Sequence, residues 1–208
     1  MEFQAWQKMS RLFRDITVTE KIDGTNACIR FAPFDENEEY PEENQLRNTC
    51  GVIFQDTEPV VVGAQSRKRM ITPDDDNFGF AKWVWNNSAS LFRDLGYGNH
   101  YGEWWGAGIQ RGYGMMDGLD RRFSLFNTKK WYDQAEYFET PNLGVVPVLY
   151  MGVFSELEIQ KAAVRLDEYG SEASPGFRPA EGVVVYFHQA NICMKYTPFE
   201  NNDGHKGN

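Results

Sequence analysis

The stretch that decides the fold is Glu20-Lys21-Ile22-Asp23-Gly24-Thr25-Asn26, near the start of a chain of 208 residues. A lysine amine becomes a nucleophile where its surroundings favour the neutral form, and its attack on a nucleotide α-phosphate would give a lysyl-nucleotide intermediate. Glycine beside such a residue allows a tight turn and the close approach of a ligand. Short motifs also match by chance, and Asp23-Gly24 suits the corner of an ordinary β-hairpin equally well. The motif therefore indicates a nucleophilic Lys21 only in combination with other clusters of the chain.

The composition excludes several classes of protein. Hydrophobic residues make up 41% and aromatic residues 15% of the chain, which is enough for a sizeable core. The net charge of −9 argues against a protein that coats nucleic acid through bulk charge, although it is compatible with a local basic groove. The cysteines are Cys28, Cys50 and Cys193, too few and too widely spaced for a disulfide framework or a zinc site. No apolar run resembles a signal peptide or a membrane span, so we expect a cytoplasmic protein (in the host cytoplasm if the source is viral).

Apolar periodicity predicts an α+β fold with largely antiparallel sheets flanked by a few helices. One helix is expected at 3–13, another at 78–95 closed by Gly96, and a third after Ser155, whose Ser-x-x-Glu spacing is that of a capping box. The first helix should bury Phe3, Trp6, Leu12 and Phe13. The third should bury Leu157, Ala162 and Leu166 and end at Gly170.

Strands are expected where β-branched and aromatic residues gather between turn residues. They are 16–20, 26–32, 50–54, 59–65, 100–105, 122–126, 144–154, 182–187 and 191–196. The acidic segment 34–48 is predicted to be a solvated loop, and 200–208 a polar tail. No linker divides the chain, so a single domain over 1–199 is expected.

Two clusters suit nucleotide binding if they lie near Lys21. Ser66-Arg67-Lys68-Arg69 alone is typical of a solvated basic turn, but Arg67 could hold a phosphate by a bidentate hydrogen bond, with Lys68 and Arg69 available for the backbone of a nucleic-acid strand. Glu103 stands in Gly102-Glu103-Trp104-Trp105-Gly106-Ala107-Gly108-Ile109-Gln110. It is either an edge-strand residue that faces water or a carboxylate that binds a ribose hydroxyl.

Two further clusters suit base stacking and phosphate chemistry. In Phe123-Ser124-Leu125-Phe126-Asn127, one phenylalanine should be in the core while the other stacks on a purine. In the predicted hairpin 182–196, Glu181 and Lys195 should lie near one another. Glu181 would hold magnesium through oxygen ligation, and Lys195 would neutralise the α-phosphate. The alternative is a surface ion pair of little energetic weight.

Taken in order, these motifs resemble those of the covalent nucleotidyltransferase superfamily of ligases and mRNA-capping enzymes. More narrowly, they resemble the RNA ligase 2 family of phages and kinetoplastids. Asn26 follows the KxDG motif where DNA ligases usually carry arginine, and the stretch from Gly102 to Gln110 is similar to the third motif of that family. The resemblance covers roughly residues 16–199.

The resemblance implies an adenylyltransferase domain and an ATP-dependent RNA ligase that needs Mg²⁺ or Mn²⁺ and acts in RNA repair. Its partners would be an RNA 5′-phosphate and an RNA 3′-hydroxyl. The expected catalytic residues are Lys21, Asp23, Glu181 and Lys195. The expected ATP-binding residues are Glu20, Lys21, Ile22, Asn26, Arg67, Glu103, Phe126 and Lys195. Glu181 is the expected metal ligand, and Arg67, Lys68 and Arg69 are the expected RNA-binding residues.

The chain departs from the family at three points, one of which is the acidic segment 34–48 between the first two motifs. Cys193 stands where the last motif usually has the first lysine of KxK, so one cation is missing. The sequence also ends soon after that motif, without the carboxy-terminal accessory domain of the family, which a partner would then supply. Two alternatives remain open at this stage. One is a DNA ligase or GTP-using capping core, and the other is a non-catalytic module that binds nucleotides or RNA ends.

Overall fold

The computed structural model describes residues 2–6, 9–35, 48–116 and 120–197. The chain forms two compact units. We call Met1–Ile22 together with Pro147–Asn208 the terminal unit, and Asp23–Val146 the central unit. The chain therefore passes from the terminal to the central unit inside the KxDG motif, and it returns between Val146 and Pro147.

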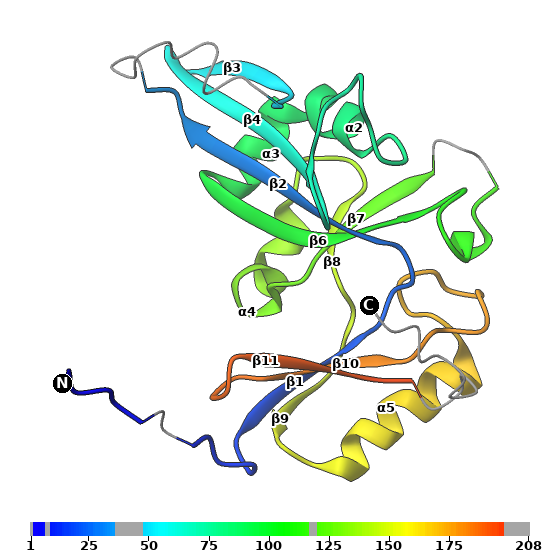
Figure 1. Ribbon diagram of the computed structural model, residues 1–208. Helices are drawn as coiled ribbons and strands as arrows, with labels where there is room; N and C mark the ends of the chain where they lie inside the picture. Colours follow the sequence, from blue (N-terminus) through cyan, green and yellow to red (C-terminus); the bar gives the residue numbers. More distant parts are fainter. Residues whose placement is uncertain (1, 7–8, 36–47, 117–119, 198–208) are drawn as a thin grey trace. The chain divides into compact units, whose positions relative to one another are not determined.

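The terminal unit is a four-stranded antiparallel sheet that packs against one helix (Figure 1). The strand order is β11-β10-β1-β9. The strands are β1 (Asp15–Glu20), β9 (Val148–Val153), β10 (Val183–Phe187) and β11 (Ile192–Tyr196). Alternate residues such as Val18 and Val183 point towards α5 (Glu156–Tyr169) and share a core with its Ala162, Ala163 and Leu166. The period of two along a strand thus gives this sheet one apolar face.

Helix α5 has the termini that the sequence predicts. Ser155 Oγ accepts a hydrogen bond from the Glu158 amide at 3.3 Å, which satisfies one of the unpaired donors of the first turn. Gly170 ends the helix with a positive φ of 87° that favours glycine. One predicted core residue is wrong, because Leu157 is 58% exposed and Ala163 is buried in its place.

The central unit is a seven-stranded sheet with the order β3-β4-β2-β6-β7-β8 and a short β5 beside β4. The strands are β2 (Thr25–Pro33), β3 (Gly51–Gln55), β4 (Glu58–Ser66), β5 (Met70–Ile71), β6 (Gly98–Gly106), β7 (Arg121–Leu125) and β8 (Leu143–Val145). All pairings are antiparallel except that of β7 with β8. The mixed α+β class with largely antiparallel sheets is therefore confirmed.

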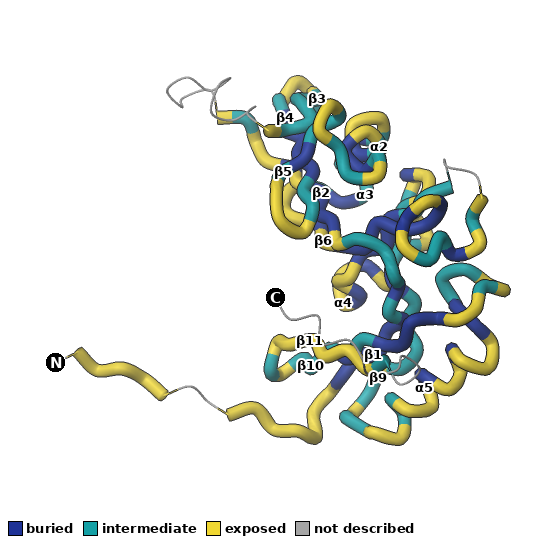
Figure 2. The backbone as a smooth tube through the Cα atoms, turned by 45° about the vertical axis from the view of Figure 1, so that its right-hand side comes forward, coloured by how far each residue is buried: buried dark blue, intermediate teal, exposed yellow. Residues whose placement is uncertain are grey.

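Helices α2 (Phe80–Asn86) and α3 (Ser88–Leu95) pack on one face of this sheet, where Phe80, Val84 and Leu91 join its core. Figure 2 shows the buried stretches running through the neighbouring strands β2, β4 and β6. The short helix α4 (Thr128–Trp131) and the 3₁₀ turns η1 (Gly112–Gly114) and η2 (Tyr132–Tyr137) complete the unit. In the described part of the chain, no helix is both long and apolar enough to cross a membrane.

Three predicted elements are corrected. The described part of 3–13 is not helical, and Phe3 and Trp6 are each more than 90% exposed, so the segment lacks the packing that short helices need. The helix expected at 78–95 is two helices. The Asn87 side chain donates to the Trp83 carbonyl at 2.8 Å and competes with the helical backbone.

The expected strand 144–154 is also two strands, β8 and β9, which belong to different sheets. Pro147 separates them because it has no amide hydrogen to continue a ladder, although its carbonyl accepts from the Glu20 amide at 2.9 Å. The predicted tail at 200–208 and residues 36–47 of the acidic segment lie outside the described residues.

Candidate functional site

The KxDG segment is not the corner of a hairpin. Strand β1 ends at Glu20 and β2 begins at Thr25, and the two strands belong to different sheets. Gly24 is required by close packing, because a Cβ atom there would lie 2.5 Å from the Trp104 carbonyl oxygen. The glycine therefore serves the approach of β6 to the motif, within the central unit.

Lys21 lies at the end of β1 in the terminal unit, and Glu181 is its partner. The Lys21 amide donates to the Gly182 carbonyl at 2.9 Å, and Lys21 Nζ forms an ion pair with Glu181 Oε1. Both side chains are largely buried, with exposed fractions of 22% and 11%. Among the described residues, Glu181 Oε2 is buried and has no hydrogen-bond partner. The buried carboxylate thus turns one oxygen to the amine, while the other has no hydrogen-bond partner among the described residues.

Glu20 anchors a loop of the terminal unit through its side chain. It is 1% exposed, and its Oε2 accepts from the amides of Glu172 and Ala173 at 2.8 and 2.9 Å. Burial raises the pKa of this carboxyl above its ordinary value, although hydrogen bonds from Ser171 and the two amides act in the opposite direction. The sequence did not predict this role, since the resemblance implies only that Glu20 binds ATP. The neighbouring Ile22 is buried.

Lys195 and Cys193 occupy alternate positions of the exposed strand β11. Lys195 lies opposite Val184 and Cys193 opposite Tyr186, so both share the sheet face that is turned away from α5. The ion pair that Glu181 forms is with Lys21. Desolvation raises the pKa of the Cys193 thiol, so this position carries no charge at neutral pH.

Glu103 organises the start of β2 in the central unit. It lies on β6, which is an interior strand between β2 and β7, and the residue is 8% exposed. Its Oε2 accepts from Asn26 Nδ2 at 2.6 Å, and its Oε1 accepts from the Gly24 amide at 3.2 Å. The structure therefore brings Glu103 and Asn26 together and rules out an edge-strand carboxylate that faces water.

Two residues that the sequence did not single out hold Asp23. Arg111 Nε donates to Asp23 Oδ2 at 2.9 Å, and the Asp23 amide donates to the Tyr113 hydroxyl at 2.7 Å. Tyr113 is 1% exposed, has a positive φ of 52°, and meets Trp105 edge to face. A bulky residue with positive φ is unusual and marks a conformation that the surroundings impose. In the sequence, the only signal for this positioning of Asp23 is the high glycine content of the loop that contains Arg111 and Tyr113.

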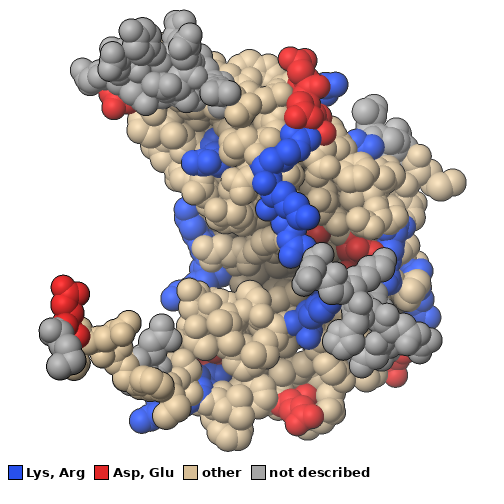
Figure 3. Space-filling view, in the orientation of Figure 1, with Lys and Arg blue, Asp and Glu red and all other residues tan. Residues whose placement is uncertain are grey.

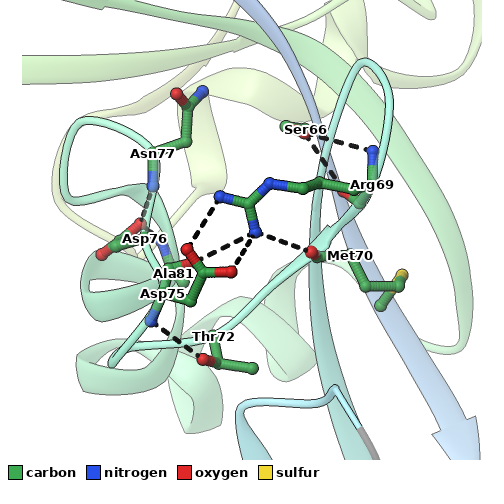
Figure 4. A network of polar contacts seen from close by, with 8 residues as sticks. All are labelled: Ser66, Arg69, Met70, Thr72, Asp75, Asp76, Asn77 and Ala81. Atoms are coloured by element: carbon green, nitrogen blue, oxygen red, sulfur yellow. Dashed lines mark hydrogen bonds and ion pairs between the residues drawn. The ribbon is translucent and has the colours of Figure 1, made fainter.

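The basic cluster after β4 divides into two parts. Arg67 and Lys68 are exposed, whereas both terminal nitrogens of Arg69 bind Asp75, at 2.5 and 2.9 Å (Figure 4). Asp76 in turn accepts from the amides of Ala81 and Lys82 and ties this loop to α2. Lys and Arg side chains gather over the β4–β5 turn beside acidic side chains (Figure 3). Arg69 therefore braces the turn that carries the other two cations.

The two phenylalanines of the third cluster differ as predicted. Phe123 is fully buried in the core of the central unit, whereas Phe126 is 42% exposed at the end of β7. Phe126 is thus the ring that remains available to a ligand.

Comparisons with known proteins agree with this fold. The family model described as RNA ligase matches residues 14–197. A Naegleria gruberi RNA ligase variant with AMP and Mn is similar at a TM-score of 0.55 and 15% identity, over 89% of this chain and 50% of that chain. A further variant of the same ligase with ATP and Mn gives a TM-score of 0.52 at 14% identity, over 87% of this chain and 48% of that one.

None of the curated protein sequences matches the chain. The chain spans about half the length of the solved ligases, and at this identity the likeness shows the fold alone. The family match covers nearly all of the sequence that carries the motifs, from before Lys21 to beyond Lys195. The chain belongs to the RNA ligase family.

Proposed function

We propose that the protein is an ATP-dependent RNA ligase in which residues 1–199 act as one adenylyltransferase domain. The observation that carries the proposal is the largely buried ion pair of Lys21 with Glu181, within a family match that covers both residues. A lysine held against a buried carboxylate is a feature that functional sites share, and this supports the proposal.

The first step would be attack of Lys21 Nζ on the α-phosphate of ATP. Because the ion pair favours the ammonium form, the amine would first have to transfer a proton, and Glu181 Oε1, which contacts Nζ, would accept it. A P–N bond forms as the bond to pyrophosphate breaks, which leaves AMP on Lys21. Lys195 would stabilise the charge on the α-phosphate. In the second step AMP would pass to an RNA 5′-phosphate, and in the third an RNA 3′-hydroxyl would attack and release AMP.

The remaining residues would bind ATP in the roles that the resemblance assigns. Glu103 and Asn26, which already bond to one another, would serve the ribose and the phosphate side. Phe126 offers an exposed ring for the adenine, and Arg67 an exposed guanidinium for a phosphate. Glu20 and Ile22 would flank the adenine through their backbone, because the Glu20 carboxylate is engaged by the 172–173 amides. Asp23 would hold the motif in shape through Arg111.

The residues present fit a divalent cation such as Mg²⁺ or Mn²⁺. Glu181 Oε2 is a buried oxygen without a hydrogen-bond partner among the described residues, and hard cations prefer oxygen ligands. The described residues contain no cluster of three or more His, Cys, Asp or Glu side chains suited to a metal. Glu181 would therefore hold the ion together with phosphate oxygens and water. The ion would neutralise charge on the phosphates.

The decisive experiment is the intact mass of the protein after incubation with ATP and Mg²⁺ or Mn²⁺. We expect a gain of one AMP, lost in Lys21→Ala and retained in Lys161→Ala, which removes an exposed lysine of α5 in the same unit. A Lys21→Ala protein that still gains AMP would contradict the assignment of the nucleophile. No gain by the wild type, even with pyrophosphatase present, would instead favour a module that only binds nucleotides or RNA ends.

The same preparation separates the ligase from its nearest alternatives. GTP in place of ATP tests a capping-type reaction, and nicked DNA in place of RNA tests a DNA ligase. For an RNA ligase, we expect AMP transfer and strand joining only with an RNA 5′-phosphate and an RNA 3′-hydroxyl. If joining requires an added accessory domain, adduct formation will occur without it while strand joining will not.

A further inference from the structure

The face of the central sheet opposite α2 and α3 carries side chains in regular cross-strand rows. One row contains Asn26 of β2, Glu103 of β6 and Ser124 of β7, which are directly paired. The next row, two residues further along the strands, contains Gln65, Cys28 and Tyr101. Because residues two apart on a strand share a face, both rows lie on the same surface.

Tyr101 is the exposed aromatic residue of the second row. Tyr101 is 52% exposed, and its carbonyl accepts from the Phe126 amide at 3.0 Å, so Phe126 continues the row just past the end of β7. Its neighbours His100 and Gly102 are buried on the other face. Core packing therefore does not explain a tyrosine at this position.

A cation lies diagonally across from this ring. Arg30 is two residues from Cys28 on β2, opposite Asn99, and it is exposed. Diagonal neighbours on one face of an antiparallel pair are within reach of long side chains. Arg30 Nη1 lies 3.7 Å from Met70 Sδ, a weak contact that leaves the guanidinium available for a stronger acceptor.

We propose that Tyr101 stacks on a nucleobase of the RNA end to be joined, while Arg30 binds the phosphate of that nucleotide. The inference rests on the proposed function, because it places this RNA next to the row that would bind ATP. Exposed aromatic rings on a sheet, with basic residues beside them, bind single-stranded RNA by stacking and phosphate contacts. A protein partner is less favoured, because Arg30, Asn99 and Gln65 make the surroundings polar rather than continuously apolar.

The test is the affinity of Tyr101→Ala for a 5′-phosphorylated RNA oligonucleotide at fixed salt, alongside its rate of adduct formation with ATP. The matched control is Tyr132→Ala, because Tyr132 has the same 52% exposure but lies in η2 rather than on the sheet. Loss of one stacked base should weaken RNA binding by about 5- to 150-fold. RNA affinity should fall by a larger factor than the adduct rate, and Tyr101→Trp should restore it.

Several results would overturn the proposal. An RNA affinity equal to that of Tyr132→Ala would remove Tyr101 from the RNA site and leave this face to a protein partner. A slower adduct rate with unchanged RNA affinity would assign the ring to ATP. Failure of the proposed function is distinguishable, because the wild type would then form no adduct even if RNA binding still depended on Tyr101. For Arg30→Ala, we expect the salt dependence of RNA binding to decrease by about one phosphate contact.

Discussion

At the scale of single residues, Asp23 shows how the motif is held in shape. Its amide and its carboxylate are both bound by the loop after β6, through the Tyr113 hydroxyl and the Arg111 guanidinium. Together they fix the residue two places after Lys21. We therefore regard Tyr113 and Arg111 as positioning residues.

Tyr113→Phe tests this role with the loss of one oxygen atom. The Asp23 amide would lose its acceptor, which should cost about 1–3 kcal/mol of unfolding free energy and slow adduct formation with ATP. Denaturant unfolding and the rate of AMP addition are the measurements, with Tyr132→Phe as the control for an exposed hydroxyl. If the phenylalanine variant matched the control in both, the hydroxyl would have no positioning role.

A second prediction at this scale concerns Cys193. The position shares a sheet face with Lys195 and carries no charge, because desolvation raises the pKa of the thiol. Cys193→Lys should therefore raise the rate of adenylylation by adding a cation beside Lys195. Cys193→Ser is the control for loss of the thiol alone. A rate equal to that of the serine variant would show that the missing family lysine is compensated elsewhere.

At the scale of elements, the β4–β5 turn combines a brace with a binding surface. The Arg69–Asp75 pair and the Asp76 contacts to the start of α2 hold the turn (Figure 4), and Arg67 and Lys68 stay exposed. A surface ion pair adds little to stability, but a bidentate one restricts geometry. The turn therefore exposes Arg67 and Lys68 to a ligand, while Arg69 binds Asp75 within the turn.

The different roles of Arg67 and Arg69 predict how the RNA affinity of variants depends on salt. RNA binding should weaken as salt rises, and Arg67→Ala should lower the slope of log affinity against log salt by about 0.7, the value for one contact to single-stranded nucleic acid. The control is Lys161→Ala, which removes one exposed cation of α5 and leaves the brace of this turn intact. A flat salt response of the wild type would argue against this turn as an RNA-binding surface.

At the scale of the whole molecule, one buried carboxyl couples stability to pH. Burial raises the pKa of Glu20 above its ordinary 4.5, so the folded protein holds this proton more tightly than the unfolded chain. The stability that the proton contributes is fully present below pH 4.5 and is lost as the pH rises through the raised value. A glutamine would keep an oxygen for the Glu172 and Ala173 amides without this titration.

We therefore expect the wild type to lose more unfolding free energy than Glu20→Gln as the pH rises above 4.5 towards neutrality. Urea unfolding at several pH values in this window gives the two curves, and Glu168→Gln, at an exposed position of α5, is the control. Parallel curves for wild type and Glu20→Gln would show that Glu20 does not contribute to the pH dependence.

The sequence by itself determined the elements whose signals are local. Alternation of apolar and polar residues predicted most strands, and Ser155 and Gly170 predicted the two ends of α5. Both signals depend only on neighbouring residues. The order of motifs from Lys21 to Lys195 was also enough for the family, since it does not depend on where the side chains point. Asn87 and Pro147 are local signals for the break between α2 and α3 and for the break between β8 and β9. Both breaks were missed from the sequence because each residue lies within a longer apolar run.

Only the tertiary structure decided the partners. Glu181 forms an ion pair with Lys21, Glu20 binds the 172–173 amides, and Asp23 is held by Tyr113, which is 90 residues away in sequence. The exposed N-terminal segment is a similar case. An amphipathic pattern of this length forms a stable helix only where its apolar face packs against the rest of the protein. The physical reason is the same in each case. A long-range contact is set by the packing of strands that are distant in sequence, and no local pattern records it.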